Sequence, residues 1–115
     1  AMTFPDYQTL KVEPRGEHVL LVTLNRPEAM NALNTQMGHD QVDLWRRLTE
    51  DPGQVRCAVL TGAGERAFCA GADLKERDGM GVEVWRVQHE LFERAFAALV
   101  ECPVPVIAAV NGHAY

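Results

Sequence analysis

Three very small residues stand directly before an acidic residue in the run Ala70-Gly71-Ala72-Asp73. Small side chains let a ligand approach the backbone closely. Backbone N–H groups at the start of a helix point outward and can stabilise a developing oxyanion. The run therefore predicts either a site for such an anion or an ordinary tight connection into a capped helix. Taken alone, the spacing favours the ordinary connection.

Asp73 begins the expected helix, and Glu76 follows three residues later, as in a capping box. In that motif the Asp73 carboxylate accepts backbone N–H groups and the Glu76 carboxylate reaches back to the amide of residue 73. Such hydrogen bonds lower the pKa of Asp73, so we expect a structural role rather than proton donation. Lys75 either points into solvent or contacts an anionic or adenine-bearing ligand.

A second glycine pattern, Gly62-x-Gly64-x-x-Ala67, follows an apolar run and matches a variant of the dinucleotide fingerprint. Dinucleotide binding requires a helix that starts within the glycines. Here Phe68-Cys69-Ala70-Gly71 intervenes, and the helix signal comes only at Asp73. A half-domain that binds NAD is therefore only a weak interpretation of this pattern.

The flanking sequence predicts the elements that must position these residues. Alternating apolar runs and glycine or proline breaks indicate a hairpin of Thr9–Pro14 and Val19–Leu24, a helix from Asn34 or Thr35 to Glu50, a buried parallel strand Cys57–Thr61, a helix from Asp73, a helix Val82–Val100 and a buried strand Val106–Val110. The order β-β-α-β-α-α-β predicts an α/β layered domain with a partly parallel sheet. The buried stripe of the long helix is expected to comprise Val84, Val87, Leu91, Ala95 and Leu99.

Composition narrows the class of protein. The 115 residues, 47% of them apolar, are enough for one domain at most. A net charge of −5 argues against unspecific binding to nucleic acid or to a membrane surface. The four histidines are scattered and the three cysteines form no C-x-x-C pair, so no metal site is expected. The first residues show no secretory signal and no apolar run could span a membrane, which predicts a cytoplasmic protein.

Four segments together resemble the enoyl-CoA hydratase/isomerase (crotonase) family. They are Leu24–Asn34, Val59–Gly64, Ala67–Lys75 and Pro105–Gly112, and they occur in the order typical of that family. The resemblance implies a crotonase-like spiral of ββα units and an acyl-CoA thioester as substrate, with no other cofactor. It also implies fatty acid metabolism and a homotrimer or dimer of trimers in the complete protein.

The resemblance assigns roles to particular residues. The N–H of Ala72 would be one of two backbone donors that hold the thioester oxygen as it becomes an enolate, which makes Ala72 the catalytic position. Residues expected to contact coenzyme A or the acyl group are Glu28, Ala29, Ala70, Ala72, Asp73, Leu74 and Lys75. Pro27 and Asn31 would shape the first loop rather than react.

The resemblance covers only the N-terminal half of a family member. Residues 1–115 are expected to be the N-terminal portion of an acyl-CoA-binding domain, truncated before the loop with the second oxyanion donor and before the catalytic carboxylates. We expect hydration of 2-enoyl-CoA in the complete protein and no activity of these residues alone. The alternatives are a non-catalytic CoA-binding fragment, or an isomerase, dehydratase or dehalogenase of the same family.

Overall fold

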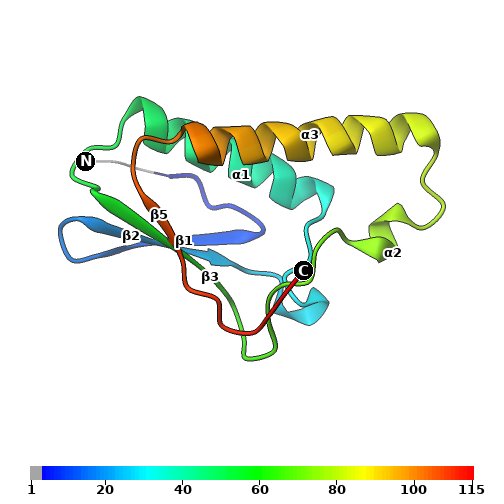
Figure 1. The fold of residues 1–115 in the computed structure, drawn as a ribbon, viewed down its shortest axis with the longest axis horizontal. Coiled ribbons are helices and arrows are strands. Elements are labelled where there is room, and N and C mark those ends of the chain that lie inside the picture. The colour runs from blue at the N-terminus through cyan, green and yellow to red at the C-terminus, as the bar shows by residue number, and fades with distance from the viewer. Residues whose placement is uncertain (1–3) are drawn as a thin grey trace.

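The computed structural model describes residues 4–115 and shows helices lying over one face of a sheet (Figure 1). The elements in chain order are β1 (Leu10–Arg15), β2 (Val19–Leu24), a 3-10 helix (Pro27–Ala29), α1 (Thr35–Glu50), β3 (Cys57–Gly62), β4 (Ala67–Cys69), α2 (Leu74–Arg77), α3 (Val82–Glu101), β5 (Val106–Ala108) and β6 (His113–Ala114). The expected α/β layering and the expected order of the main elements are confirmed.

The main sheet has the strand order β1-β2-β3-β5. β1 and β2 form the expected antiparallel hairpin, with Leu10 opposite Leu24. β3 runs parallel to both β2 and β5, which confirms the expected parallel strand. The expectation that Val106–Val110 is buried is wrong, because β5 is an edge strand and Ile107 is 56% exposed.

The core lies between the sheet and α1. Alternate residues of β2 turn toward the helix, so Leu20, Val22 and Leu24 are buried while their neighbours are half-buried. Trp45 of α1 is fully buried among them. Asn34 begins α1 as expected, because its side chain accepts the N–H of Met37 and satisfies one free amide of the first turn.

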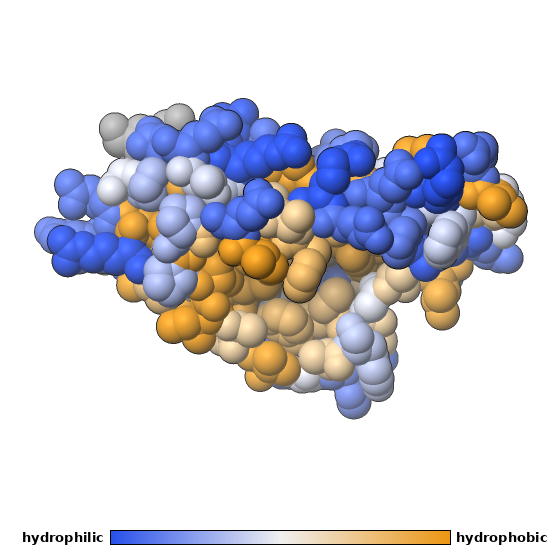
Figure 2. All heavy atoms as spheres, turned by 45° about the horizontal axis from the view of Figure 1, so that its top comes forward, coloured by the Kyte–Doolittle hydropathy of each residue, from blue (hydrophilic) through white to orange (hydrophobic). Residues whose placement is uncertain are grey.

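α3 packs beside α1, but its buried side differs from the expected stripe. Leu91 and Ala95 are buried as expected, whereas Val84 and Val87 are 59% and 54% exposed. α3 is longer than α1, and its N-terminal part extends past the start of α1 (Figure 1). A helix buries only the part of its apolar stripe that meets a neighbour. The surface accordingly carries several apolar areas beside the charged ones (Figure 2).

A second, two-stranded sheet was not foreseen in the sequence. β4 and β6 pair in parallel, with Ala67 opposite His113. The dinucleotide interpretation is wrong, because β4 occupies the place where the fingerprint requires a helix to start. No helix within residues 4–115 is long and apolar enough to cross a membrane. The secretory-signal argument also drew on residues 1–3, which lie outside the described residues.

Candidate functional site

Two loops lie side by side at the ends of β2 and β3. The first loop comprises residues 26–33 and the second loop residues 63–73. The N–H of Leu33 donates to the Gly71 oxygen at 2.8 Å, and the Leu33 oxygen accepts the N–H of Asp73 at 2.9 Å. The N–H of Ala70 donates to the Met30 oxygen at 3.1 Å. These bonds fix the small-residue turn against the first loop.

The bonding pattern determines the direction of the Ala72 amide. Leu33 and Ala72 form an isolated parallel bridge, in which Leu33 bonds to the residues on either side of Ala72. In such a bridge the N–H of the intervening residue points away from the partner segment. Within residues 4–115 the Ala72 N–H has no hydrogen-bond acceptor. Gly71 has a φ of +87°, a value that glycine adopts without strain and that turns the chain here.

Asn31 ties the two loops together from inside. Its side chain is fully buried, and its Nδ2 donates to the oxygens of Ala63 and Ala67, each at 3.0 Å. Its Oδ1 accepts the N–H of Arg26 at 2.9 Å. Asn31 adopts a φ of +57°, in the left-handed region that asparagine tolerates better than most residues. Its hydrogen bonds fit the expected role in shaping the first loop.

Asn111 closes the second loop from the other side. Its Oδ1 accepts the N–H of Gly62 at 3.0 Å, and its Nδ2 donates to the oxygens of Gly64 and Ala67 at 3.2 and 3.3 Å. The Asn111-Gly112 pair after a strand is a local turn signal in the sequence. Its long-range contacts could not be read from a local turn signal.

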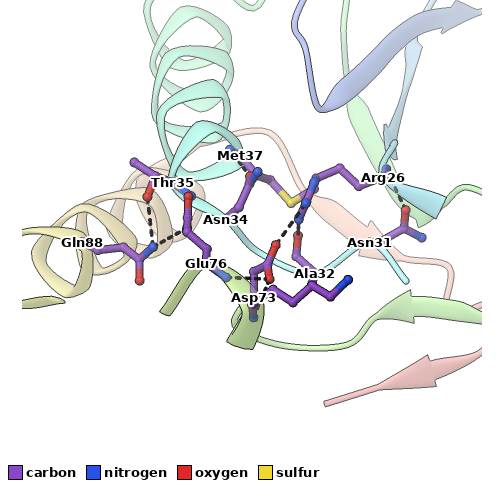
Figure 3. Close-up of polar contacts among 10 residues, drawn as sticks. Arg26, Asn31, Ala32, Asn34, Thr35, Met37, Asp73, Glu76 and Gln88 are labelled. Carbon is purple, nitrogen blue, oxygen red and sulfur yellow. Dashed lines mark hydrogen bonds and ion pairs between the residues drawn. The ribbon is translucent and has the colours of Figure 1, made fainter. Parts of the chain in front are cut away.

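The Asp73 carboxylate is held by three contacts, among them an ion pair that the sequence did not reveal. One carboxylate oxygen accepts the amides of Lys75 and Glu76 at 3.0 and 3.2 Å, as expected for a helix cap. The other lies 3.0 Å from the guanidinium of Arg26, which also donates to the Ala32 oxygen at 2.7 Å (Figure 3). Burial would raise the pKa of Asp73, but the Glu76 amide and Arg26 outweigh it and lower that pKa. Asp73 is therefore a carboxylate at neutral pH, as expected, and a poor proton donor.

The expected capping box is only half formed. The Asp73 N–H donates to Leu33, and the Glu76 carboxylate instead accepts the N–H of Thr35 at 2.8 Å and the side-chain amide of Gln88 at 2.6 Å. α2 itself is a single turn of four residues. So short a helix sums few peptide dipoles. Its dipole therefore adds little at Ala72, and the direction of the Ala72 amide comes from the β-bridge.

The remaining expected contact residues lie on the same two loops and on α2. Glu28 and Ala29 belong to the 3-10 helix of the first loop, where Glu28 is exposed and Ala29 half-buried. Leu74 is 78% exposed and Lys75 is exposed, both on α2. The structure thus brings all seven expected positions onto adjoining segments. Within residues 4–115 no three His, Cys, Asp or Glu side chains gather as metal ligands do.

Comparison with known proteins identifies the family. The family model described as enoyl-CoA hydratase/isomerase matches residues 15–115. The chain is 45% identical over 100 residues to the putative enoyl-CoA hydratase/isomerase YngF of Bacillus subtilis, which covers 87% of the chain and 38% of that relative. It is 44% identical over 108 residues to a probable enoyl-CoA hydratase of Rhodobacter capsulatus, covering 94% of the chain and 40% of the relative. The chain belongs to the enoyl-CoA hydratase/isomerase family.

Solved structures agree on the fold. The crystal structure of an enoyl-CoA hydratase from Bacillus anthracis superimposes with a TM-score of 0.87 at 38% identity, over 91% of this chain and 40% of that one. The expected crotonase-like fold is therefore confirmed. The reactions named among relatives vary, since the carnitinyl-CoA dehydratase of Proteus mirabilis is 40% identical over 94% of the chain and 40% of its own length. The chain spans about two fifths of the length of the relatives it matches.

Proposed function

We propose that this chain supplies the N-terminal part of a domain that binds an acyl-CoA thioester and stabilises its enolate. One observation carries the proposal: the Ala72 N–H points away from the bridging Leu33 and has no acceptor within residues 4–115. A backbone donor whose position is fixed in advance stabilises a developing oxyanion without reorganisation. The small side chain at this position leaves room for an acyl group.

Coenzyme A would lie along the two loops and α2. The proposed contacts are Glu28, Ala29, Ala70, Asp73, Leu74 and Lys75. Lys75 is exposed and offers a cation to the phosphates, while the exposed Leu74 offers an apolar surface to the adenine. The Asp73 carboxylate is already bonded to two amides and to Arg26. We therefore assign its contact to the main-chain oxygen, since the Asp73 N–H already donates to Leu33.

The proposed reaction of the complete protein is the hydration of 2-enoyl-CoA. Asp73 adjoins Ala72, but its lowered pKa makes it unsuited to donate the proton. We propose that the second oxyanion donor and the proton-transferring carboxylates come from the part of the domain that the longer relatives possess and residues 1–115 do not contain. Residues 1–115 alone would then have no hydratase activity and act at most as a CoA-binding fragment. Dehydration is the second candidate, since a carnitinyl-CoA dehydratase is 40% identical.

Assembly, location and cofactor use complete the proposal. We propose a homotrimer or dimer of trimers for the complete protein, a role in fatty acid metabolism, and no cofactor beyond the CoA thioester itself. A cytoplasmic location is supported by Cys57, Cys69 and Cys102, which are all free thiols. Sequencing the gene past the codon for Tyr115 would show whether a glycine-rich loop and glutamates follow.

The Ala72 donor is tested with a pair of variants of the complete gene product, followed by the ultraviolet absorbance of crotonyl-CoA. Ala72→Pro removes the N–H, whereas Ala72→Gly keeps it. We expect Ala72→Pro to lower kcat by about 10²–10³, the usual effect of losing one oxyanion donor. Ala72→Gly should stay close to wild type. Equal activity of both variants, with unchanged melting temperatures, would contradict the proposal.

A second measurement needs no variant. The wild-type protein should bind an acyl-CoA thioester more tightly than the matching thioether, which lacks the carbonyl oxygen that Ala72 would contact. Titration calorimetry measures both dissociation constants. Equal affinities would argue against the oxyanion donor, and binding of NAD in preference to CoA would overturn the proposed ligand.

A further inference from the structure

α2 carries two of the proposed contact residues but has little to stabilise it from within. It has four residues, and none of them is buried. A single helical turn is unstable on its own, because fixing it costs more conformational entropy than its few hydrogen bonds return. Gly79 and Gly81 follow it, and open space surrounds both. Contacts with other elements must therefore hold α2 in place.

Four polar side chains provide these contacts between α1, α2 and α3. The Glu76 carboxylate accepts the Thr35 N–H at 2.8 Å and the Gln88 Nε2 at 2.6 Å. The same Gln88 nitrogen donates to the Thr35 hydroxyl at 3.0 Å, and Arg77 Nε donates to the Gln88 Oε1 at 2.9 Å. Gln88 is a polar residue of α3, yet it is only 3% exposed (Figure 3).

The chemistry of the partners fixes the orientation of the Gln88 amide. A carboxylate only accepts hydrogen bonds and a guanidinium only donates them. Glu76 therefore requires the NH₂ group of Gln88, and Arg77 requires its oxygen. The Arg77 guanidinium also lies over the rings of Trp85 and Phe92, at 5.5 and 5.7 Å from their centres. Both side chains that leave α2 toward α3 are thus held at defined positions.

We propose that Gln88 and Glu76 are positioning residues for the acyl-CoA site. By holding α2 against α1 and α3, they fix Leu74 and Lys75 at the positions that receive the ligand. The inference rests on the proposed function, and neither side chain needs to touch the ligand.

The test uses the complete gene product. It introduces a negative charge at position 88 and then restores a hydrogen bond between positions 76 and 88. In Gln88→Glu two carboxylates face each other at the position of a 2.6 Å hydrogen bond and repel. In the double variant Glu76→Gln/Gln88→Glu, the amide at position 76 donates to the carboxylate at 88, which also accepts from Arg77, but the Thr35 N–H loses the oxygen that accepts it in the wild type. Tyr7→Phe is the matched control, because it removes a half-buried 2.8 Å hydrogen bond to Asp43 far from α2.

Two readouts are followed: hydrogen exchange of the amides of residues 75–78, which donate to Asp73 and Leu74, and KM and kcat for crotonyl-CoA. Gln88→Glu should speed the exchange and raise KM about tenfold, as expected if about a tenth of the molecules hold α2 in the competent position. The fall in kcat should be smaller. The double variant should restore both readouts in part, because the Thr35 N–H stays without its acceptor. Tyr7→Phe should change neither readout even where it lowers the melting temperature.

Three results would overturn the inference, and a fourth would overturn the proposed function. Unchanged exchange in Gln88→Glu overturns the inference, as does faster exchange with unchanged KM. A double variant whose KM is no lower than that of Gln88→Glu also overturns it. If the wild-type protein binds neither coenzyme A nor crotonyl-CoA, the proposed function fails, and the exchange rates alone then decide whether the network holds α2.

Discussion

The ion pair between Arg26 and Asp73 joins the two loops, and we expect it to stabilise the protein more than an exposed pair of the same residue types. Its guanidinium and carboxylate are 3.0 Å apart, and the side chains are only 17% and 13% exposed. Arg47 and Asp43 on α1 form the comparison pair, with 2.7 Å between the charged atoms and side chains 48% and 44% exposed. The first pair has less access to water, and it joins distant segments instead of two turns of one helix.

The expected coupling free energy of each pair follows from its exposure to solvent. Two unit charges 3.0 Å apart attract by roughly 5.5 kcal/mol at an effective dielectric constant of about 20. Desolvation of the two groups and the ordering of their side chains cancel most of this attraction. We expect a net coupling of about 1.5 kcal/mol between Arg26 and Asp73. The exposed pair should show a clearly smaller coupling, because solvent screens it.

A double-mutant cycle measures both couplings by urea denaturation. The variants are Arg26→Gln and Asp73→Asn for the first pair, and Arg47→Gln and Asp43→Asn for the second. Asparagine retains an oxygen that can accept the amides of the α2 cap, so the cycle isolates the charge interaction. The reasoning is refuted if the coupling between Arg26 and Asp73 is no larger than that of the exposed pair.

The same pair gives the stability a defined pH dependence. The pKa of Asp73 is lowered in the folded protein. Its contribution is therefore fully present above the unfolded value, about pH 4, and is lost as the pH falls through the folded value. Asp73→Asn should remove this part of the acid dependence while leaving the neutral plateau flat. An identical acid profile in the variant and the wild type would contradict the assignment.

Two further predictions concern the packing of the loops. A Cβ at Gly62 would lie 2.6 Å from the Phe68 oxygen, so we expect Gly62→Ala to cost about 3 kcal/mol in denaturation. Gly81→Ala, with nothing within 4 Å, should cost less than about 1 kcal/mol, and equal losses would refute the steric argument. Asn31→Ala should cost about 3 kcal/mol, because it leaves the Ala63 oxygen and the Arg26 N–H without their partners at a φ of +57°. Asn31→Gly should cost about 1 kcal/mol less, since glycine relieves the left-handed backbone; the reverse order would argue against strain there.

Local signals in the sequence were sufficient for the main elements. The hairpin, α1 with its cap at Asn34, and α3 were predictable because apolar periodicity and capping residues act within a few positions. The strands β4 and β6 could not be predicted in this way. Each has two or three residues, and each is defined only by pairing with the other across the chain.

In the candidate site, too, contacts between residues close in the sequence could be predicted and contacts between distant residues could not. Asp73 was predictable as a cap, because its partners are two and three residues away. The partners of Arg26 and Glu76 could not be predicted, because they lie 47 and 12 or more residues away in the sequence and depend on the tertiary fold. Gln88 carries no local signal at all: a polar residue on a helix is usually exposed, and here it is buried between three helices.

The single turn α2 separates two kinds of position within four consecutive residues. Glu76 and Arg77 face the protein and hold the turn, whereas Leu74 and Lys75 face solvent and make no side-chain hydrogen bond or ion pair within residues 4–115. Substitutions at the outward pair can therefore accumulate at little cost to folding. Evolution could therefore change which ligand groups this turn binds while the fold stays the same. Ligand selectivity can thus change here independently of stability.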